Sequence, residues 1–166
     1  MPWSGRLTAL RPGPIDVHAH LLPRRCYRIP AGDSEVELNE RDGRLHLGEL
    51  PIAVSGDELS SVPRLLADMD AYDVAVRVVS APPYAFAIQA GAEAAVEYAR
   101  RFNDALLEDL AGHPDRLVPF GVVPIQDAVA TAAEIRRLVA EGVVGISVPP
   151  VVGDSALGDT DLRHVL

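Results

Sequence analysis

The chain has 166 residues, 48% of them hydrophobic and 23% charged, which is enough for one domain with a core and too few for two. Fifteen basic against 24 acidic residues give a formal net charge of −9, so we expect neither nucleic acid nor an anionic membrane as a partner. The single cysteine, Cys26, cannot form a disulfide within the chain, and no stretch approaches the roughly 20 apolar residues of a membrane helix. These features predict an acidic, soluble domain of the cytoplasm.

The first element expected along the chain is a strand. Residues 1–14 are predicted to form a loose N-terminal tail that ends in the breaker Pro-Gly-Pro, and residues 15–20 then alternate between apolar and polar side chains. A polar segment from about residue 24 to residue 62 follows. Within it, Asp42-Gly43 lies between two short strand-like runs and predicts a small hairpin. We interpret this segment as an insertion after the first strand.

Helices and strands alternate regularly after the insertion. Helices are predicted at residues 63–72, 90–110 and 128–140, strands at residues 74–80, 117–123 and 144–148, and the start of a further helix at residues 158–160. Strands that alternate with helices of this length indicate βαβ units and a parallel sheet with helices packed outside. We therefore predict an α/β fold with about four βα units.

His18 and His20 carry the clearest chemical signal. Residues i and i+2 of a strand project to the same face, so both imidazoles can reach one cation. The pair lies at the carboxyl end of the first strand of a βα repeat, where α/β folds place their active sites. Asp16 shares this face and is placed to accept a proton from a ligand imidazole, which would fix its tautomer. The residues alone also allow the interpretation that both histidines are ordinary surface side chains.

Three further features are candidates for parts of a site. Tyr84 and Phe86 follow the second strand and are expected in the pocket wall, where they could stack on a flat substrate; the alternative is an ordinary proline-stiffened loop. Cys26 could in principle bind a metal, but no second soft ligand is nearby, so it is interpreted as a plain thiol near the pocket rim. Asn103 and Asp104, on the long helix, are interpreted as a structural pair.

Residues 15–23, with the sequence IDVHAHLLP, resemble the opening metal motif of the amidohydrolase superfamily. More narrowly, they resemble its amidohydrolase-related branch, which includes aminocarboxymuconate semialdehyde decarboxylase. Further motifs resemble that branch in the same order, so that the resemblance extends over residues 14–166. They lie at residues 64–74, 101–104, 112–127, 142–146 and 158–162.

The resemblance implies the N-terminal half of a metal-dependent (β/α)8 TIM barrel, formed by residues 15–166 and truncated before strand five, with the small hairpin insertion after strand one. A full barrel of this kind needs about 250 residues. His18 and His20 match the first two ligands of a divalent metal, for which zinc is expected. The family's third ligand, its general-base histidine and its closing aspartate have no counterpart in the chain, so no catalytic residue is assigned.

The activity that the resemblance implies is decarboxylation or hydrolysis of a small carboxylated or cyclic substrate. The first half of such a sequence does not separate the two reactions. A rival hypothesis is a non-catalytic half-barrel that is stable only through self-association, for example as a homodimer, or through a partner chain. It is motivated by the two open edges that a four-stranded parallel sheet would leave.

Overall fold

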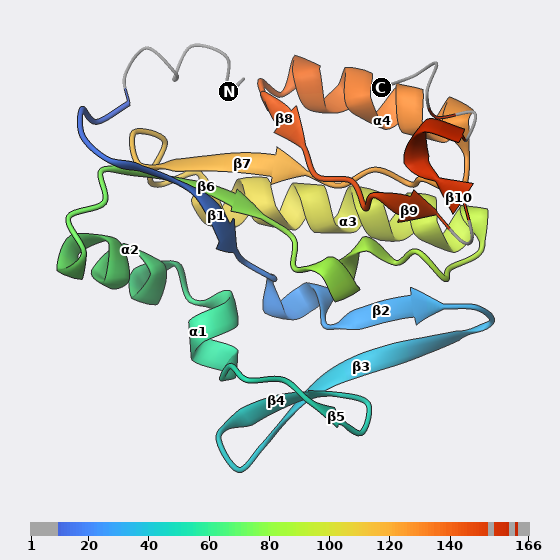
Figure 1. Ribbon diagram of the computed structural model, residues 1–166, viewed down its shortest axis with the longest axis horizontal. Coiled ribbons are helices and arrows are strands. Elements are labelled where there is room, and N and C mark those ends of the chain that lie inside the picture. Colours follow the sequence, from blue (N-terminus) through green and yellow to red (C-terminus); the bar gives the residue numbers. More distant parts are fainter. Residues whose placement is uncertain (1–9, 153–154, 160–161, 163–166) are drawn as a thin grey trace.

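A parallel sheet forms the centre of the molecule. The computed structural model describes residues 10–152, 155–159 and 162. In it, β1 (Ile15–His20), β6 (Val76–Ser80), β7 (Leu117–Gly121) and β8 (Gly145–Ile146) are parallel neighbours in this order (Figure 1). Each strand lies within a predicted one, which confirms the predicted α/β fold. β8 is shorter than expected and has two residues.

Three helices connect these strands. α2 (Val62–Ala71) precedes β6, α3 (Ala92–Leu110) joins β6 to β7, and α4 (Ala128–Ala140) joins β7 to β8 (Figure 1). α4 has the predicted bounds because Asp127 accepts hydrogen bonds from two backbone N–H groups of its first turn, while Gly142 adopts a left-handed φ of 84° just beyond its end. No helix in the described ranges has both the length and the apolar character needed to cross a membrane.

The insertion after β1 is an antiparallel sheet. The predicted hairpin is confirmed as β3 (Ser34–Arg41) and β4 (Arg44–Leu47), joined by Asp42 and Gly43, which both have positive φ. The insertion is larger than the predicted hairpin, because β2 (Arg28–Ala31) and β5 (Leu50–Pro51) extend it to four strands. Both additional strands are short and contain a proline, so they show no alternation of apolar and polar residues by which a strand is predicted.

Short helices flank this antiparallel sheet. The 3₁₀ helix η3 (Arg24–Cys26) precedes it, and α1 (Gly56–Ser60) follows it. α1 was not predicted, although Ser55 and Glu58 form a capping box at its start. The two ends of the insertion are joined directly: the N–H of Leu22 donates to the carbonyl of Leu59 over 3.0 Å, and the hydroxyl of Ser60 donates to the carbonyl of Leu22 over 2.6 Å.

The described residues beyond β8 form two strands that were not predicted and a short helix that overlaps the predicted start of a further helix. β9 (Val151–Val152) and β10 (Ser155–Ala156) pair as a short antiparallel ladder, and the 3₁₀ helix η5 (Leu157–Asp159) follows. Residues 160–161 and 163–166, which belong to the predicted last helix, lie outside the described residues. The same holds for residues 1–9 of the predicted tail.

One hydrophobic core is shared by the parallel sheet and the insertion. It includes Leu38 and Leu45 from the insertion together with Tyr98 and Phe102 from α3, all at most 3% exposed. The insertion therefore packs as part of the domain, as expected. Burial of large side chains of this kind contributes about 1.5–3 kcal/mol each.

Asn103 joins three elements behind the sheet. Its side chain is 1% exposed; its amide donates to the carbonyl of Val122 and to Glu134 of α4, and its oxygen accepts from the N–H of Val122. Asp104, the next residue, is exposed and forms an ion pair with Arg137. These contacts agree with the structural interpretation of the Asn-Asp pair.

Replacing Asn103 with alanine removes three hydrogen bonds and leaves polar groups of Val122 buried without this partner. We expect the free energy of unfolding to fall by about 2–4 kcal/mol, measured by urea denaturation followed by circular dichroism. The matched control Asp104→Ala removes only an exposed ion pair and should cost less than about 1 kcal/mol. Equal losses in both variants would contradict the structural importance of Asn103.

Candidate metal centre

The structure brings the two predicted metal ligands together at the carboxyl end of β1. The Nε2 atoms of His18 and His20 lie 3.3 Å apart, and their rings meet edge to face with centroids separated by 5.0 Å. His18 is exposed and His20 is half-buried. The hydroxyl of Ser80, at the end of β6, lies 3.3 Å from Nδ1 of His20. Nδ1 thus contacts the neighbouring strand, while Nε2 faces His18.

His20 is suited to act as a neutral ligand. Burial of the ring, followed by the charge of His18, lowers its pKa below the ordinary histidine value, and backbone groups of Ser80 and Ala81 act in the opposite direction. A metal ligand must present an unprotonated nitrogen, so a lowered pKa removes part of the proton competition near neutral pH.

The distance between the two nitrogens fits a shared cation. Two nitrogens bound tetrahedrally to one zinc ion, each about 2.0–2.1 Å from it, lie about 3.3–3.4 Å apart. His18 and His20 have this spacing, and their donor type is one that zinc and other first-row metals accept. In the part of the chain that the structure describes, no group of three or more His, Cys, Asp or Glu side chains is placed to hold a metal. The pair therefore offers two nitrogens at the spacing of such a site, and its role as a metal ligand stays a prediction.

Asp16 contacts the main chain of the pair and a charge on the next strand. Its Oδ1 accepts a hydrogen bond from the backbone N–H of His18 over 3.0 Å, and its Oδ2 lies 2.9 Å from Nε of Arg77. The predicted contact with a ligand imidazole stays a prediction. The expected regular alternation of β1 is interrupted by a shift of register between Asp16 and Ala19.

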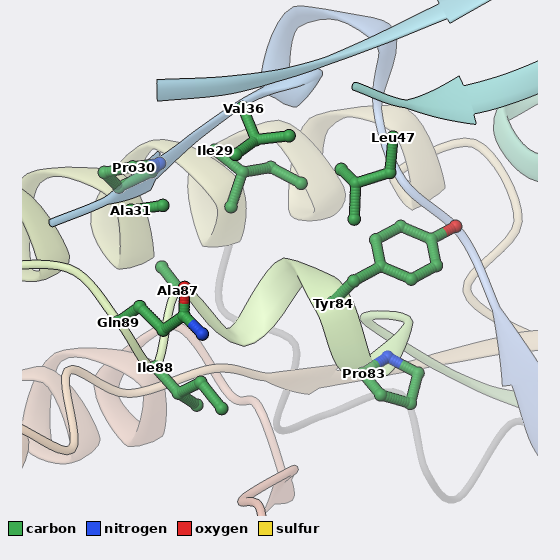
Figure 2. A pocket seen from close by; sticks show the side chains of 10 residues that line it. All are labelled: Ile29, Pro30, Ala31, Val36, Leu47, Pro83, Tyr84, Ala87, Ile88 and Gln89. Atoms are coloured by element: carbon green, nitrogen blue, oxygen red, sulfur yellow. The ribbon is translucent and has the colours of Figure 1, made fainter. Parts of the chain in front are cut away.

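Tyr84 and Phe86 lie on the 3₁₀ helix η4 (Pro83–Phe86), after the carboxyl end of β6. A cavity of about 200 Å³ lies between η4 and the insertion. Figure 2 shows Tyr84 on its wall and the apolar side chains of Ile29 and Leu47 opposite. Phe86 is not among its lining residues and packs half-buried against the core. The remaining lining residues are Pro30, Ala31, Val36, Pro83, Ala87, Ile88 and Gln89.

The cavity and the histidine pair are different places in the structure, because neither His18 nor His20 lines the cavity. Burial raises the pKa of Tyr84 to about 12, so its phenol keeps its proton near neutral pH. Contact of Tyr84 and Phe86 with a substrate stays a prediction.

Two residues beside the histidine pair, Ser80 and Arg77, were not singled out from the sequence. Ser80 ends β6 directly opposite His20 in the register, and Arg77 lies opposite Asp16. A signal for Arg77 was available, because it is the only charged residue of the apolar run VAVRVVS at residues 74–80. A charge in a buried strand usually has a partner.

The family model described as Amidohydrolase matches residues 15–165, so the chain belongs to the amidohydrolase family. This agrees with the resemblance of the motif around His18 and His20.

The curated relatives are longer proteins. The chain is 30% identical to 2-amino-3-carboxymuconate-6-semialdehyde decarboxylase of Caenorhabditis elegans, in an alignment that covers 89% of this chain and 43% of the relative. It is 40% identical to gamma-resorcylate decarboxylase of Rhodococcus jostii (strain RHA1) over 78 residues, which cover 46% of this chain and 24% of the relative. The chain thus spans less than half the length of these relatives.

Solved structures share the fold. IDCase of Metarhizium anisopliae, in its apo form, superposes with a TM-score of 0.77 at 19% identity, covering 93% of this chain and 47% of that one. A dihydroxybenzoic acid decarboxylase from Polaromonas sp. JS666, with bound manganese and the inhibitor 2-nitroresorcinol, gives a TM-score of 0.67 at 24% identity and covers 91% of this chain and 44% of that one. The coverage agrees with the predicted N-terminal half of a (β/α)8 barrel.

Cys26 is buried in the core, so the expectation of a thiol near the pocket rim is wrong, and we predict that the thiol is unreactive. Its side chain is fully buried, and desolvation raises the pKa of its thiol. We expect a thiol reagent such as DTNB to modify the native chain at least about a hundredfold more slowly than the urea-unfolded chain. In the native chain the fold must first open around Cys26, and its thiol must then lose a proton. Equal rates in both states would show that Cys26 is accessible and would reopen its role as a ligand.

Proposed function

We propose that this chain carries two metal ligands of a metal-dependent decarboxylase that acts on a small carboxylated substrate. The observation that carries the proposal is the spacing of 3.3 Å between the Nε2 atoms of His18 and His20 at the carboxyl end of β1. The names of the two relatives support the reaction, since both are decarboxylases of unsaturated or aromatic acids. Hydrolysis, the other reaction implied by the sequence, has no such support among these two relatives.

His18 and His20 would hold the metal, and their surroundings orient the His20 ring and favour its neutral form. A divalent cation held there supplies positive charge that stabilises negative charge developing on a substrate oxygen. His20 offers a neutral ring, because burial lowers its pKa, and Ser80 orients that ring through Nδ1. Zinc was expected from the resemblance, whereas the Polaromonas structure contains manganese. The binding experiment below therefore uses both metals.

The substrate proposed is a flat acid of the kind named in the relatives, an aromatic or conjugated carboxylate. The protonated phenol of Tyr84 and the ring of Phe86 follow β6, the strand next to the metal pair, and are proposed to contact it. The cytoplasmic location and the expectation that neither nucleic acid nor a membrane is a partner stay predictions.

Metal binding by the pair is tested by titrating the purified chain with Zn²⁺ and Mn²⁺ in a calorimeter. We expect one ion per chain, and His18→Ala or His20→Ala should abolish binding in the same concentration range, because each removes a ligand. The control His113→Ala, in the turn between α3 and β7, should bind like the wild type. Equal binding by all variants would contradict the assignment.

Sedimentation of the same samples distinguishes the proposed function from the rival hypothesis of a self-associating, non-catalytic half-barrel. The observation that favours it is the exposure of two apolar side chains on β1, Ile15 at 59% and Val17 at 75%. A dimer that binds no metal would support the rival, and a monomer that binds metal tightly would exclude it.

Decarboxylation itself is tested with the protein encoded by the whole reading frame. Loaded with Zn²⁺ or Mn²⁺, it should release CO₂ from 2,6-dihydroxybenzoate or a related acid. His18→Ala should lower kcat/KM by at least about a thousandfold, because metal charge stabilisation supplies several kcal/mol. Hydrolysis of cyclic amides or esters without any CO₂ release would favour the hydrolase alternative instead.

A further inference from the structure

β1 contains one residue more than β6 across the stretch that includes His18. Between the aligned pairs Asp16 with Arg77 and Ala19 with Val79, β1 has two residues where β6 has one. This is a β-bulge, a feature that bends a strand and re-aims its side chains, often beside active sites. His18 is one of the two residues in the bulge. Its ring direction therefore depends on how the bulge is held.

The side chain of Asp16 holds the main chain of the bulge. A bulged residue is left out of the regular ladder, so the N–H of His18 needs an acceptor of another kind. Oδ1 of Asp16 accepts it over 3.0 Å, the local side-chain-to-backbone pattern typical of aspartate two residues earlier. This bond fixes the backbone from which the His18 ring projects.

Arg77 in turn holds the carboxylate of Asp16. Oδ2 of Asp16 lies 2.9 Å from Nε of Arg77, whose side chain is only 12% exposed. The contact is an ion pair, because the Nε–H is not directed at the oxygen as a hydrogen bond requires. Since the two residues are directly opposite each other in the register, their ion pair ties the bulged strand to β6.

We propose that Asp16 and Arg77 are positioning residues for the metal centre and together form a clamp on the bulge. The clamp sets the backbone at His18 so that its Nε2 meets that of His20 at 3.3 Å. Neither clamp residue binds the metal. The inference deepens the proposed function and rests on it, since it concerns the same histidine pair.

The clamp is tested by measuring the Zn²⁺ affinity of clamp variants in the full chain. Asp16→Ala removes both contacts and should weaken binding by about 10–100-fold, the range typical of residues that orient metal ligands. Asp16→Asn keeps an oxygen for the His18 N–H and loses the ion pair, so its loss should be smaller. Because Arg77 acts through charge, Arg77→Lys should recover most of the affinity that Arg77→Met loses.

A matched control comes from a second ion pair, at the amino end of β6. Arg116 is also buried, and its Nη1 lies 2.6 Å from Asp70 while its other nitrogens contact backbone carbonyls of residues 74 and 75. Asp70→Asn should lower the melting temperature and leave the Zn²⁺ affinity unchanged. If Asp16 had a purely structural role, Asp16→Ala would likewise lower the melting temperature and leave the Zn²⁺ affinity unchanged.

A second readout needs no metal. In the metal-free wild type, ring protons of His18 and His20 should show a nuclear Overhauser contact, and the His18 amide should exchange slowly with solvent. Both should be lost in Asp16→Ala while circular dichroism shows a folded chain. If that variant is folded and keeps the ring contact and the wild-type Zn²⁺ affinity, the clamp is overturned and the proposed function stands.

The two proposals fail in different ways. If the wild type binds neither Zn²⁺ nor Mn²⁺, the proposed function fails, and the ring contact and amide exchange decide the clamp alone. If Asp16→Ala does not fold, Asp16→Asn and the comparison of Arg77→Lys with Arg77→Met provide the same test. Equal affinity in Arg77→Met and the wild type would overturn the part assigned to Arg77.

Discussion

The parallel pairing of β1 with β6 aligns the groups that surround His18 in the candidate metal centre. It places Ser80 opposite His20 and Arg77 opposite Asp16, and the N–H of Leu21 continues the pairing by donating to the carbonyl of Ser80 over 3.1 Å. None of these neighbours is close in sequence. The geometry of the histidine pair is therefore a product of strand pairing as well as of the local spacing.

Much of the fold could be predicted because its strongest elements carry local signals. The strand at Ile15–His20 and the helix at Ala128–Ala140 have the predicted bounds, since one follows a proline breaker and the other has a cap at each end. β2 and β5 were missed because their pairing depends on the tertiary fold of the insertion more than on local propensity. β8 is shorter than predicted and is the last strand of its sheet.

The candidate site likewise has a part that the sequence predicted and a part that it did not. The spacing of His18 and His20 was sufficient to predict that their rings share a face, and the structure places them together. The bulge was not predictable from a period-two pattern, because it is defined by the register with a partner 60 residues away, as in the pair of His20 with Ser80. Arg77 was passed over for the same reason, since its partner Asp16 is distant in sequence.

The closed base of the insertion has a consequence for how this family can vary. The hydrogen bonds of Leu22 with Leu59 and Ser60 bring the two ends of the insertion side by side, outside its antiparallel sheet. Lengthening a loop whose ends are already fixed together costs little additional entropy. Evolution can therefore remodel the wall that faces Tyr84 by insertion or deletion, while the strand that carries the histidines keeps its register. The cavity wall and the histidine pair are in this sense structurally independent parts of the fold.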